Sequence, residues 1–253
     1  MINLDIIIPV YNEAENIEKV LSSLRRDVKI SFRVLICYDN DDDTTLQVVE
    51  NFKKDCPFDI LFVKNQGKGV HSAILTGFQF STSDAVLVYP GDDQHNAKII
   101  DKMYHKIKIG SDVVAASRFI HGGSMVNCPW IKSILVRTAS FTLYWFALIP
   151  IRDASNGFRM FSKRILDNFE IESTKGFTYS IELLVKCHRY GWKISEVPSH
   201  WLEREKGSSR FNLSQWLPHY VRWYLYGFKT TFMRMGPETV KLKLNSILQQ
   251  RED

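Results

Sequence analysis

The stretch that decides the fold runs from Ala85 to Asn96 and reads AVLVYPGDDQHN. It begins as a short run of Val and Leu with the length of a buried strand, and Pro90-Gly91 then breaks that strand. Two carboxylates, an amide and an imidazole follow at once. Oxygen ligands at the carboxyl edge of a sheet suit Mg²⁺ or Mn²⁺, and such an ion suits a diphosphate. The alternative is an acidic turn in which Asp93 caps the next helix.

Apolar runs of the same kind alternate with amphipathic segments along the first half of the chain. We expect strands at 4–10, 32–38, 59–63, 85–89 and 113–117, with a helix after each of the first four. This alternation indicates βαβ units, and hence an α/β fold with a mainly parallel, Rossmann-like sheet flanked by helices. Because such crossovers are right-handed, the loops at Asp39, Gly67 and Asp92 should converge at one edge of the sheet.

After Arg118 the pattern becomes less regular. We expect an apolar helix at 133–148, a helix at 179–187, a strand at 192–197 and an aromatic, basic helix at 216–235. Trp and Tyr beside Lys and Arg are typical of helices at a lipid interface, whereas core packing or a dimer contact is the alternative. Arg137 interrupts the longest apolar stretch, so a buried or interfacial helix is expected there and not a transmembrane one.

Composition narrows the class of protein. The 253 residues are 45% hydrophobic, which allows one large core or a core with an appendage. The net charge of +5 is compatible with a polyanionic ligand or an anionic membrane surface, and no basic stripe of a nucleic-acid-binding motif is present. Four cysteines without a CxxC pair favour reduced thiols in a cytosolic protein over a zinc site. The first residues lack the features of a signal peptide.

Six motifs in order resemble those of family 2 glycosyltransferases with the GT-A fold, over residues 4–212. The segments that carry the resemblance are Ile8–Glu13, Tyr38-Asp39-Asn40, Asn65–Gly69 with Gly77, Asp92-x-Gln94-His95, Asp153 with Gly157-Phe158-Arg159, and Val197-Pro198 followed by Arg204, Gly207, Ser208 and Arg210. Asp92-x-Gln94-His95 is similar to the metal motif of the polyprenyl-phosphate glycosyltransferases. The resemblance implies a nucleotide-diphosphate sugar donor, a divalent cation and inversion at the anomeric carbon.

Three positions depart from the family pattern. Pro90 stands where the family has an Asp, so a bound metal would lose one carboxylate, for which Asp93 could compensate. The segment 38–43 replaces Asp-Asp-Gly-Ser-Thr-Asp, which alters the expected contacts to the base. Arg210 replaces a Lys and keeps its charge with a planar, forked geometry.

The resemblance and the chemistry of the side chains together assign roles. The predicted metal ligands are Asp92, Gln94 and Asp93. The predicted donor-binding residues are Pro9, Tyr11, Glu13, Asp39, Gly67, Lys68 and Asp92. The predicted acceptor- and phosphate-binding residues are Arg118, Arg137, Arg204, Ser208 and Arg210. The predicted catalytic residues are Asp92, Asp153, Arg118 and Arg204. For single residues the plainer alternatives are an N-cap or Asx-turn at Asp39, a solvated lysine at Lys68 and surface arginines.

The role of Asp153 depends on the acceptor. An ionised phosphate needs no strong general base, so Asp153 would orient groups around it, whereas a sugar hydroxyl would need a base. Three hypotheses therefore stand: transfer to a polyprenyl-phosphate-like lipid, transfer to a saccharide or protein hydroxyl, and a weakly active nucleotide-sugar-binding protein. A Rossmann dehydrogenase is disfavoured, because no GxGxxG follows the first strand.

The whole chain is accordingly expected to be a hexosyltransferase-type enzyme. Residues 1–212 would form the GT-A domain, and 213–253 would form an amphipathic, interfacial helical extension. The expected partners are Mg²⁺ or Mn²⁺, a UDP- or GDP-sugar, a lipid-phosphate acceptor and a membrane surface, without nucleic acid. We expect a cytoplasmic protein attached peripherally to the inner face of the membrane, and a homo-oligomer is allowed.

Overall fold

The computed structural model describes residues 2–202 and 213–244, with side chains in the second range from residue 217. Its elements are, in chain order, β1 (Leu4–Pro9), α1 (Ile17–Asp27), β2 (Phe32–Tyr38), α2 (Thr44–Lys53), β3 (Asp59–Lys64), α3 (Gly69–Phe80), β4 (Ala85–Val88), η1 (Ala97–Ile99), α4 (Ile100–Lys108), β5 (Val113–Ser117), β6 (Ser124–Val126), α5 (Trp130–Trp145), β7 (Arg159–Ser162), α6 (Lys163–Asn168), α7 (Thr178–Arg189), β8 (Ile194–Pro198), β9 (His200–Leu202), α8 (Leu213–Phe232) and η2 (Pro237–Thr239).

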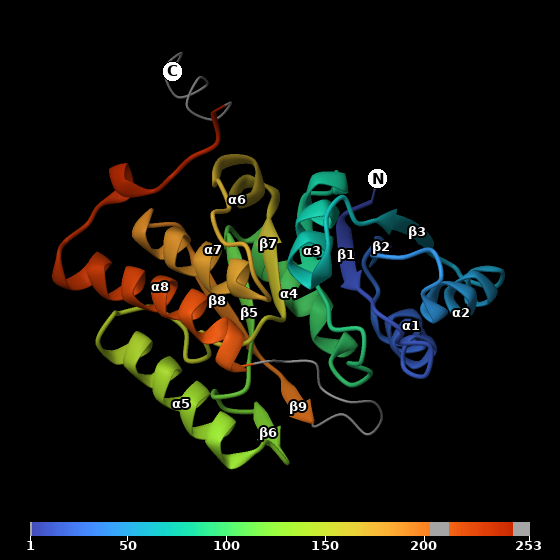
Figure 1. The fold of residues 1–253 in the computed structure, drawn as a ribbon, viewed down its shortest axis with the longest axis horizontal. Coiled ribbons are helices and arrows are strands. Elements are labelled where there is room, and N and C mark those ends of the chain that lie inside the picture. Colours follow the sequence, from blue (N-terminus) through green and yellow to red (C-terminus); the bar gives the residue numbers. More distant parts are fainter. Residues whose placement is uncertain (1, 203–212, 245–253) are drawn as a thin grey trace.

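Seven strands of the described residues form one sheet in the order β3-β2-β1-β4-β7-β5-β8 (Figure 1). All neighbouring strands run parallel except β7, which is antiparallel to both β4 and β5. The short strands β6 and β9 pair in parallel as a separate ribbon. The predicted α/β fold with a mainly parallel sheet is confirmed.

Alternate residues of each strand point to opposite sides of the sheet, and helices pack against both sides. The sheet is therefore buried on both faces. Ile6 and Ile8 join the cluster formed with α1, α2 and α4, whereas Ile7 joins the cluster formed with α3, α6 and α7. Continuous Val, Ile and Leu runs are therefore explained by burial on both faces. With its strands held in this way, the sheet offers a rigid edge from which the connecting loops project.

Strand β7 is the main feature that the sequence did not predict. It lies between β4 and β5, where Arg159 is opposite Val88 on one side and Ala115 on the other. The run is only four residues long and begins with an arginine, so its pattern does not indicate a buried strand. Its insertion separates β4 from β5 and leaves the ends of both strands at the same edge of the sheet.

The C-terminal helix α8 packs against α7 and α5 (Figure 1). Trp223 is buried, and the Lys186 Nζ atom lies 5.1 Å from the centroid of its ring. Arg222 also forms an ion pair with Glu172, with 2.9 Å between Nη2 and Oε1. The predicted boundary between residues 212 and 213 borders the part of the chain outside the described residues, and the two-part division stays a prediction.

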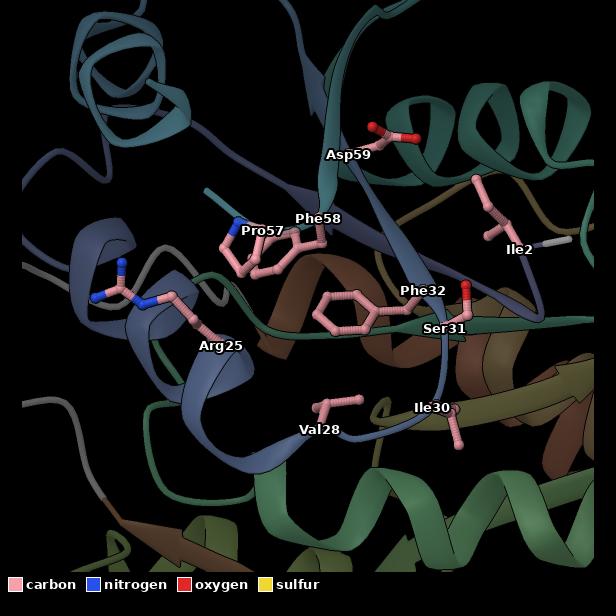
Figure 2. A pocket seen from close by; sticks show the side chains of 9 residues that line it. All are labelled: Ile2, Arg25, Val28, Ile30, Ser31, Phe32, Pro57, Phe58 and Asp59. Atoms are coloured by element: carbon pink, nitrogen blue, oxygen red, sulfur yellow. The ribbon is translucent and has the colours of Figure 1, made fainter. Parts of the chain in front are cut away.

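A surface pocket of about 310 Å³ lies beside the starts of β2 and β3 (Figure 2). Phe32 and Phe58 pack in it with ring centroids 4.5 Å apart, and Arg25 from α1 lies at its rim. Parallel strands bring their carboxyl ends to the other edge of the sheet, so this pocket is remote from the loops predicted to bind ligand.

Candidate active site

The loops after β1 and β2 are joined by reciprocal hydrogen bonds. The backbone N–H of Asn12 donates to both carboxylate oxygens of Asp43 at 3.1 Å, and the Asn12 side-chain oxygen accepts from the N–H of Thr44 at 3.2 Å. The N–H of Glu13 donates to the Thr45 hydroxyl at 2.9 Å. Asn12 adopts a left-handed conformation with φ 54°, which asparagine tolerates better than most residues. Glu13 is therefore held beside the start of α2.

Asp39, at the end of β2, fixes the loop that follows β3. One carboxylate oxygen accepts from the Asn65 side-chain amide at 2.6 Å, and the other accepts from the N–H of Gly69 at 2.8 Å. Asn65 in turn accepts from the N–H of Gly67 at 3.0 Å. The residue that caps α2 is Asp43, so the alternative that Asp39 is this cap is wrong. Asp39 thus fixes the loop 65–69 at the start of α3, and Lys68 in this loop is exposed.

The turn after β4 packs against the loop after β1. A Cβ atom on Gly91 would lie 3.5 Å from the Pro9 carbonyl oxygen and 3.8 Å from the Glu13 Cγ atom, so the two loops are in van der Waals contact. Asp92 and Gln94 are half-buried at this junction. The convergence of the loops at Asp39, Gly67 and Asp92, predicted from right-handed crossovers, agrees with the bonds and contacts that join them.

Asp93 builds the turn itself. Its carboxylate accepts from the N–H groups of His95 and Asn96 at 2.9 and 3.0 Å, and from the Asn96 side chain at 2.7 Å. Burial raises the pKa of this carboxyl above its usual range, although these hydrogen bonds act in the opposite direction. The turn-building alternative therefore describes the observed contacts of Asp93.

A buried ion pair lies at the end of β5. The Arg118 Nε and Nη2 atoms donate to the two oxygens of Asp153 at 2.7 and 2.9 Å, and the Arg118 backbone N–H adds a bond of 3.0 Å. Ser155 accepts from Nη2 at 2.6 Å and donates to Asp153 at 3.0 Å. Burial alone would raise the Asp153 pKa, but the charge and hydrogen bonds of Arg118 outweigh it and the pKa is lowered.

Arg159 holds the backbone of the same loop. Its guanidinium is fully buried and donates to the carbonyl oxygens of Ala154 and Ser180 at 2.6 and 2.5 Å, and more weakly to that of Asp153 at 3.4 Å. Burial lowers the pKa of Arg159 to about 10. Arg118 thus holds the side chains of Asp153 and Ser155, and Arg159 holds the backbone carbonyl groups of Asp153 and Ala154.

A second group of cations lies around Phe119. The Arg118 and Arg137 Cζ atoms lie 5.1 and 4.9 Å from the centroid of its ring. Nearby, the Lys132 Nζ atom lies 4.9 Å from the ring centroid of Trp201 in β9. Arg137 and Lys132 belong to α5, so this helix supplies positive charge next to the ion pair at the end of β5.

The residues 5–169 match the sequence model of the family described as "Glycosyl transferase family 2". This match covers well over half of the chain. The chain belongs to glycosyl transferase family 2. The family predicted from the six motifs is therefore confirmed.

Two similar curated proteins carry the names dolichol-phosphate mannosyltransferase and polyprenol monophosphomannose synthase. The chain is 28% identical over 226 residues to the dolichol-phosphate mannosyltransferase of Pyrococcus furiosus, covering 87% of this chain and 63% of that protein. It is 25% identical over 213 residues to the polyprenol monophosphomannose synthase of Mycolicibacterium smegmatis, covering 82% of this chain and 80% of that protein. The chain thus spans less than two thirds of the archaeal relative.

Solved structures confirm the GT-A fold. Glucosyl-3-phosphoglycerate synthase of Mycobacterium tuberculosis, in complex with Mn²⁺, UDP-glucose and phosphoglyceric acid, superposes with a TM-score of 0.66 at 14% identity, covering 89% of this chain and 79% of that one. Its complex with Mn²⁺, UDP and glucosyl-3-phosphoglycerate gives a TM-score of 0.65 at 15% identity, with the same coverage. At these identities the likeness concerns the fold alone.

In this family 2 chain, the predicted donor residues all lie at the carboxyl edge of the sheet: Pro9 ends β1, and Tyr11, Glu13, Asp39, Gly67 and Lys68 lie on the loops. Arg118 and Asp153 lie at the same edge, with Arg137 beside them on α5. The predictions for Arg204, Ser208 and Arg210 lie outside the described residues. Within the described residues, no group of three or more His, Cys, Asp or Glu side chains could hold a metal ion by itself. Asp92 and Gln94 fit a cation that takes its remaining oxygen ligands from a bound diphosphate.

Sequence reasoning missed several residues that organise this site. Hydrogen bonds that build or join its loops come from Asn12, Asp43, Asn65, Asn96 and Ser155. The signal was present, because each is a short polar residue directly after a strand or in a polar turn. Their partners lie between 2 and 104 residues away, however, and no local pattern identifies them.

Proposed function

We propose that this protein transfers a sugar from a nucleoside-diphosphate sugar to a polyprenyl-phosphate-type lipid, with inversion and with Mg²⁺ or Mn²⁺. The observation that supports it best is the position of Arg118 relative to the turn at Asp92. β4 and β5 end at one edge with β7 between them, so their ends are about 10 Å apart, two strand spacings. A hexose with its diphosphate spans a distance of this order.

The proposed donor side is the junction of the loops after β1, β2, β3 and β4. A bound Mg²⁺ or Mn²⁺ would act as a Lewis acid that stabilises the charge on the departing diphosphate. Asp92 and Gln94 would hold it. Lys68, exposed directly before α3, would add positive charge near the phosphates, and the dipole of α3 points its positive end to the same place. The N–H of Gly69 at this helix start already donates to Asp39.

The proposed acceptor side is the group of Arg118 and Arg137. The Nη1 atom of Arg118 lies 3.7 Å from the thioether sulfur of Met125, a weak acceptor that a phosphate oxygen could replace. An oxygen of the ionised lipid phosphate would attack the anomeric carbon while the bond to the diphosphate breaks and its electron pair leaves with the nucleotide. Such a nucleophile carries no proton to remove, so no base is required.

The state of Asp153 favours this acceptor over a hydroxyl. Both of its oxygens accept hydrogen bonds from Arg118, and its lowered pKa keeps it ionised and paired near neutral pH. A general base at this position would have to leave Arg118. Asp153 is better suited to holding Arg118, and the hydroxyl-acceptor hypothesis lacks a base among the groups predicted for it.

The exposed faces of α5 and α8 support attachment to a membrane surface. The two helices lie side by side (Figure 1), joined by a hydrogen bond of 2.8 Å between the Thr142 and Tyr224 hydroxyl groups. Large apolar side chains on them are exposed, Trp130 by 72% and Trp145 by 54%. Neither helix contains Asp or Glu, whereas both contain Lys and Arg. This combination suits an anionic lipid surface.

Among the described residues, no helix has both the length and the apolar character needed to cross a bilayer. The proposed contact with lipid rests on the exposed apolar and basic side chains of α5 and α8. The location on the cytoplasmic side, the domain division and the oligomeric state remain predictions.

The first experiment is a transfer assay with purified protein, a panel of UDP- and GDP-sugars, Mn²⁺ or Mg²⁺ and a short polyprenyl phosphate. We expect metal-dependent glycosyl-lipid formation from one donor and its loss in Asp92→Ala. Asp84→Ala is the matched control, because Asp84 precedes the same strand at its other end and is exposed with only a loose ion pair to Lys108 at 3.9 Å. The catalytic proposal is wrong if no donor is turned over by the wild type.

The second experiment measures binding to sedimented vesicles with and without anionic lipid. Trp145→Glu should weaken binding to anionic vesicles several-fold, because it removes apolar area that would enter the lipid and adds a negative charge that anionic headgroups repel. Phe80→Glu is the control, since Phe80 is equally exposed at the end of α3, away from α5 and α8. Equal effects of both substitutions would remove α5 as the contact surface.

A further inference from the structure

Asn96 forms a two-point contact with the backbone of β9. Its side-chain oxygen accepts from the N–H of His200 at 2.9 Å, and its side-chain nitrogen donates to the His200 carbonyl oxygen at 2.7 Å. The same nitrogen donates to Asp93 at 2.7 Å. Asn96 is buried, with 2% of its surface exposed, and its contact with His200 joins residues 104 positions apart in the sequence. A single amide therefore joins the turn that carries Asp92 to a distant strand.

The strand held in this way leads directly to the acceptor side. β9 pairs with β6 so that Ser124 lies opposite His200, and their side chains are 2.8 Å apart at Oγ and Nδ1. The next residue of β6, Met125, contacts Arg118, and the next residue of β9, Trp201, packs under Lys132 of α5. The β6–β9 ribbon thus lies between the Asp92 turn and the cations proposed to bind the acceptor.

Only an amide satisfies all three partners of Asn96. The N–H of His200 needs an acceptor, whereas the His200 carbonyl and the Asp93 carboxylate both need a donor. An aspartate would lose both donated bonds and place a second charge against Asp93. An apolar side chain of the same size would remove the partner of both backbone groups of His200 and one of the hydrogen bonds to Asp93.

We propose that Asn96 is a positioning residue that holds the donor side and the acceptor side of the site in one frame. The claim rests on the proposed function, because it concerns the alignment of the two substrates. It assigns Asn96 no contact with either substrate. Loss of the amide should therefore impair the step that needs both substrates and leave largely intact the step that needs the donor alone.

The test uses Asn96→Leu and Asn96→Asp in the full chain, with Asn96→Ser as a milder variant if either fails to fold. The control is Asn51→Leu, because Asn51 is exposed on α2 and its side-chain oxygen accepts a hydrogen bond of 3.3 Å from the exposed Lys54 side chain, which solvent can replace. Hydrogen exchange of residues 199–202 is measured without ligand and with UDP or GDP plus Mn²⁺. Transfer to polyprenyl phosphate and hydrolysis of the sugar nucleotide are measured in parallel.

We expect the His200 amide to exchange at least tenfold faster in Asn96→Leu than in the wild type or in Asn51→Leu. Transfer should fall at least tenfold while hydrolysis changes less than threefold, a split that general destabilisation would not produce. Unchanged exchange at His200, or an equal loss of transfer and hydrolysis, would overturn the role of Asn96. Failure of the wild type to bind UDP or GDP would instead overturn the proposed function, and the exchange measured without ligand would then show only whether the contact is structural.

Discussion

Replacing Asp153 by Asn separates a positioning role from a role as general base. The carboxylate is fully buried and accepts three hydrogen bonds from Arg118, at 2.7, 2.9 and 3.0 Å. Asn keeps the shape but leaves the buried guanidinium without a countercharge. Breaking a buried pair on one side costs about 3–5 kcal/mol. For a chain of this length a loss of about 4 kcal/mol lowers the melting temperature by roughly 8–16 °C.

The assay is a double-mutant cycle of Asp153→Asn and Arg118→Met, followed by urea unfolding. Removing both charges takes away the uncompensated ion, so the double variant should be more stable than the sum of the two losses predicts, by at least about 2 kcal/mol. Asp167→Asn serves as the control, because its pair with Lys163 is exposed at 3.5 Å and should cost less than about 1 kcal/mol.

Two results together would contradict a structural role for the Arg118–Asp153 pair. If Asp153→Asn costs less than about 1 kcal/mol and the two substitutions are additive within about 0.5 kcal/mol, the pair does not hold the site together. A large loss of turnover with intact stability and donor binding would then favour a base at Asp153 and a hydroxyl acceptor.

Three further predictions concern the frame around the site. Gly77→Ala should lower the free energy of unfolding by about 1–3 kcal/mol in urea titrations, because its Cβ would lie 2.9 Å from Ile7 Cδ1. Asp5→Asn should flatten the pH dependence of stability below about pH 4. Burial would raise the Asp5 pKa, but hydrogen bonds from Arg33 and other groups lower it. The stabilisation that ionised Asp5 provides is therefore complete above its unfolded pKa and is lost as the pH falls through its folded pKa. Arg159→Lys should cost about 3 kcal/mol in the same titration, because a lysine cannot reach several carbonyl groups at once, and an unchanged midpoint would contradict this.

The sheet could be predicted because most of its strands have a recognisable pattern in the local sequence. The runs at 4–9, 32–38 and 85–88 are apolar on both faces and end in polar turns, and right-handed crossovers then bring those turns to one edge. β7 could not be predicted in this way, since Arg159 begins a buried strand only because carbonyl groups from Ala154 and Ser180 receive its charge. That compensation comes from packing, which the local pattern does not contain.

The residue types of the site could be predicted, but their roles could not. Asp39, Asp93 and Asp153 are all carboxylates in loops at the right edge, and from sequence each is a candidate to touch a ligand. In the structure Asp39 and Asp153 accept hydrogen bonds from N–H groups 30 and 35 residues away along the chain, whereas Asp93 accepts from residues of its own turn. A sequence pattern locates the edge, whereas the pairing that decides between a ligand contact and a structural contact depends on tertiary structure.

This division of roles explains how a site with several carboxylates can receive an anionic donor and an anionic acceptor. The charge of Asp39 is directed into the Asn65 amide and the Gly69 N–H of the next loop, and that of Asp93 into N–H groups of its own turn. The charge of Asp153 is neutralised by Arg118. What the edge presents outward is then the exposed cations Lys68 and Arg137, together with the half-buried Asp92. The carboxylates thus fix the positions of N–H donors and cations before any substrate arrives, which reduces the reorganisation that the reaction would otherwise require.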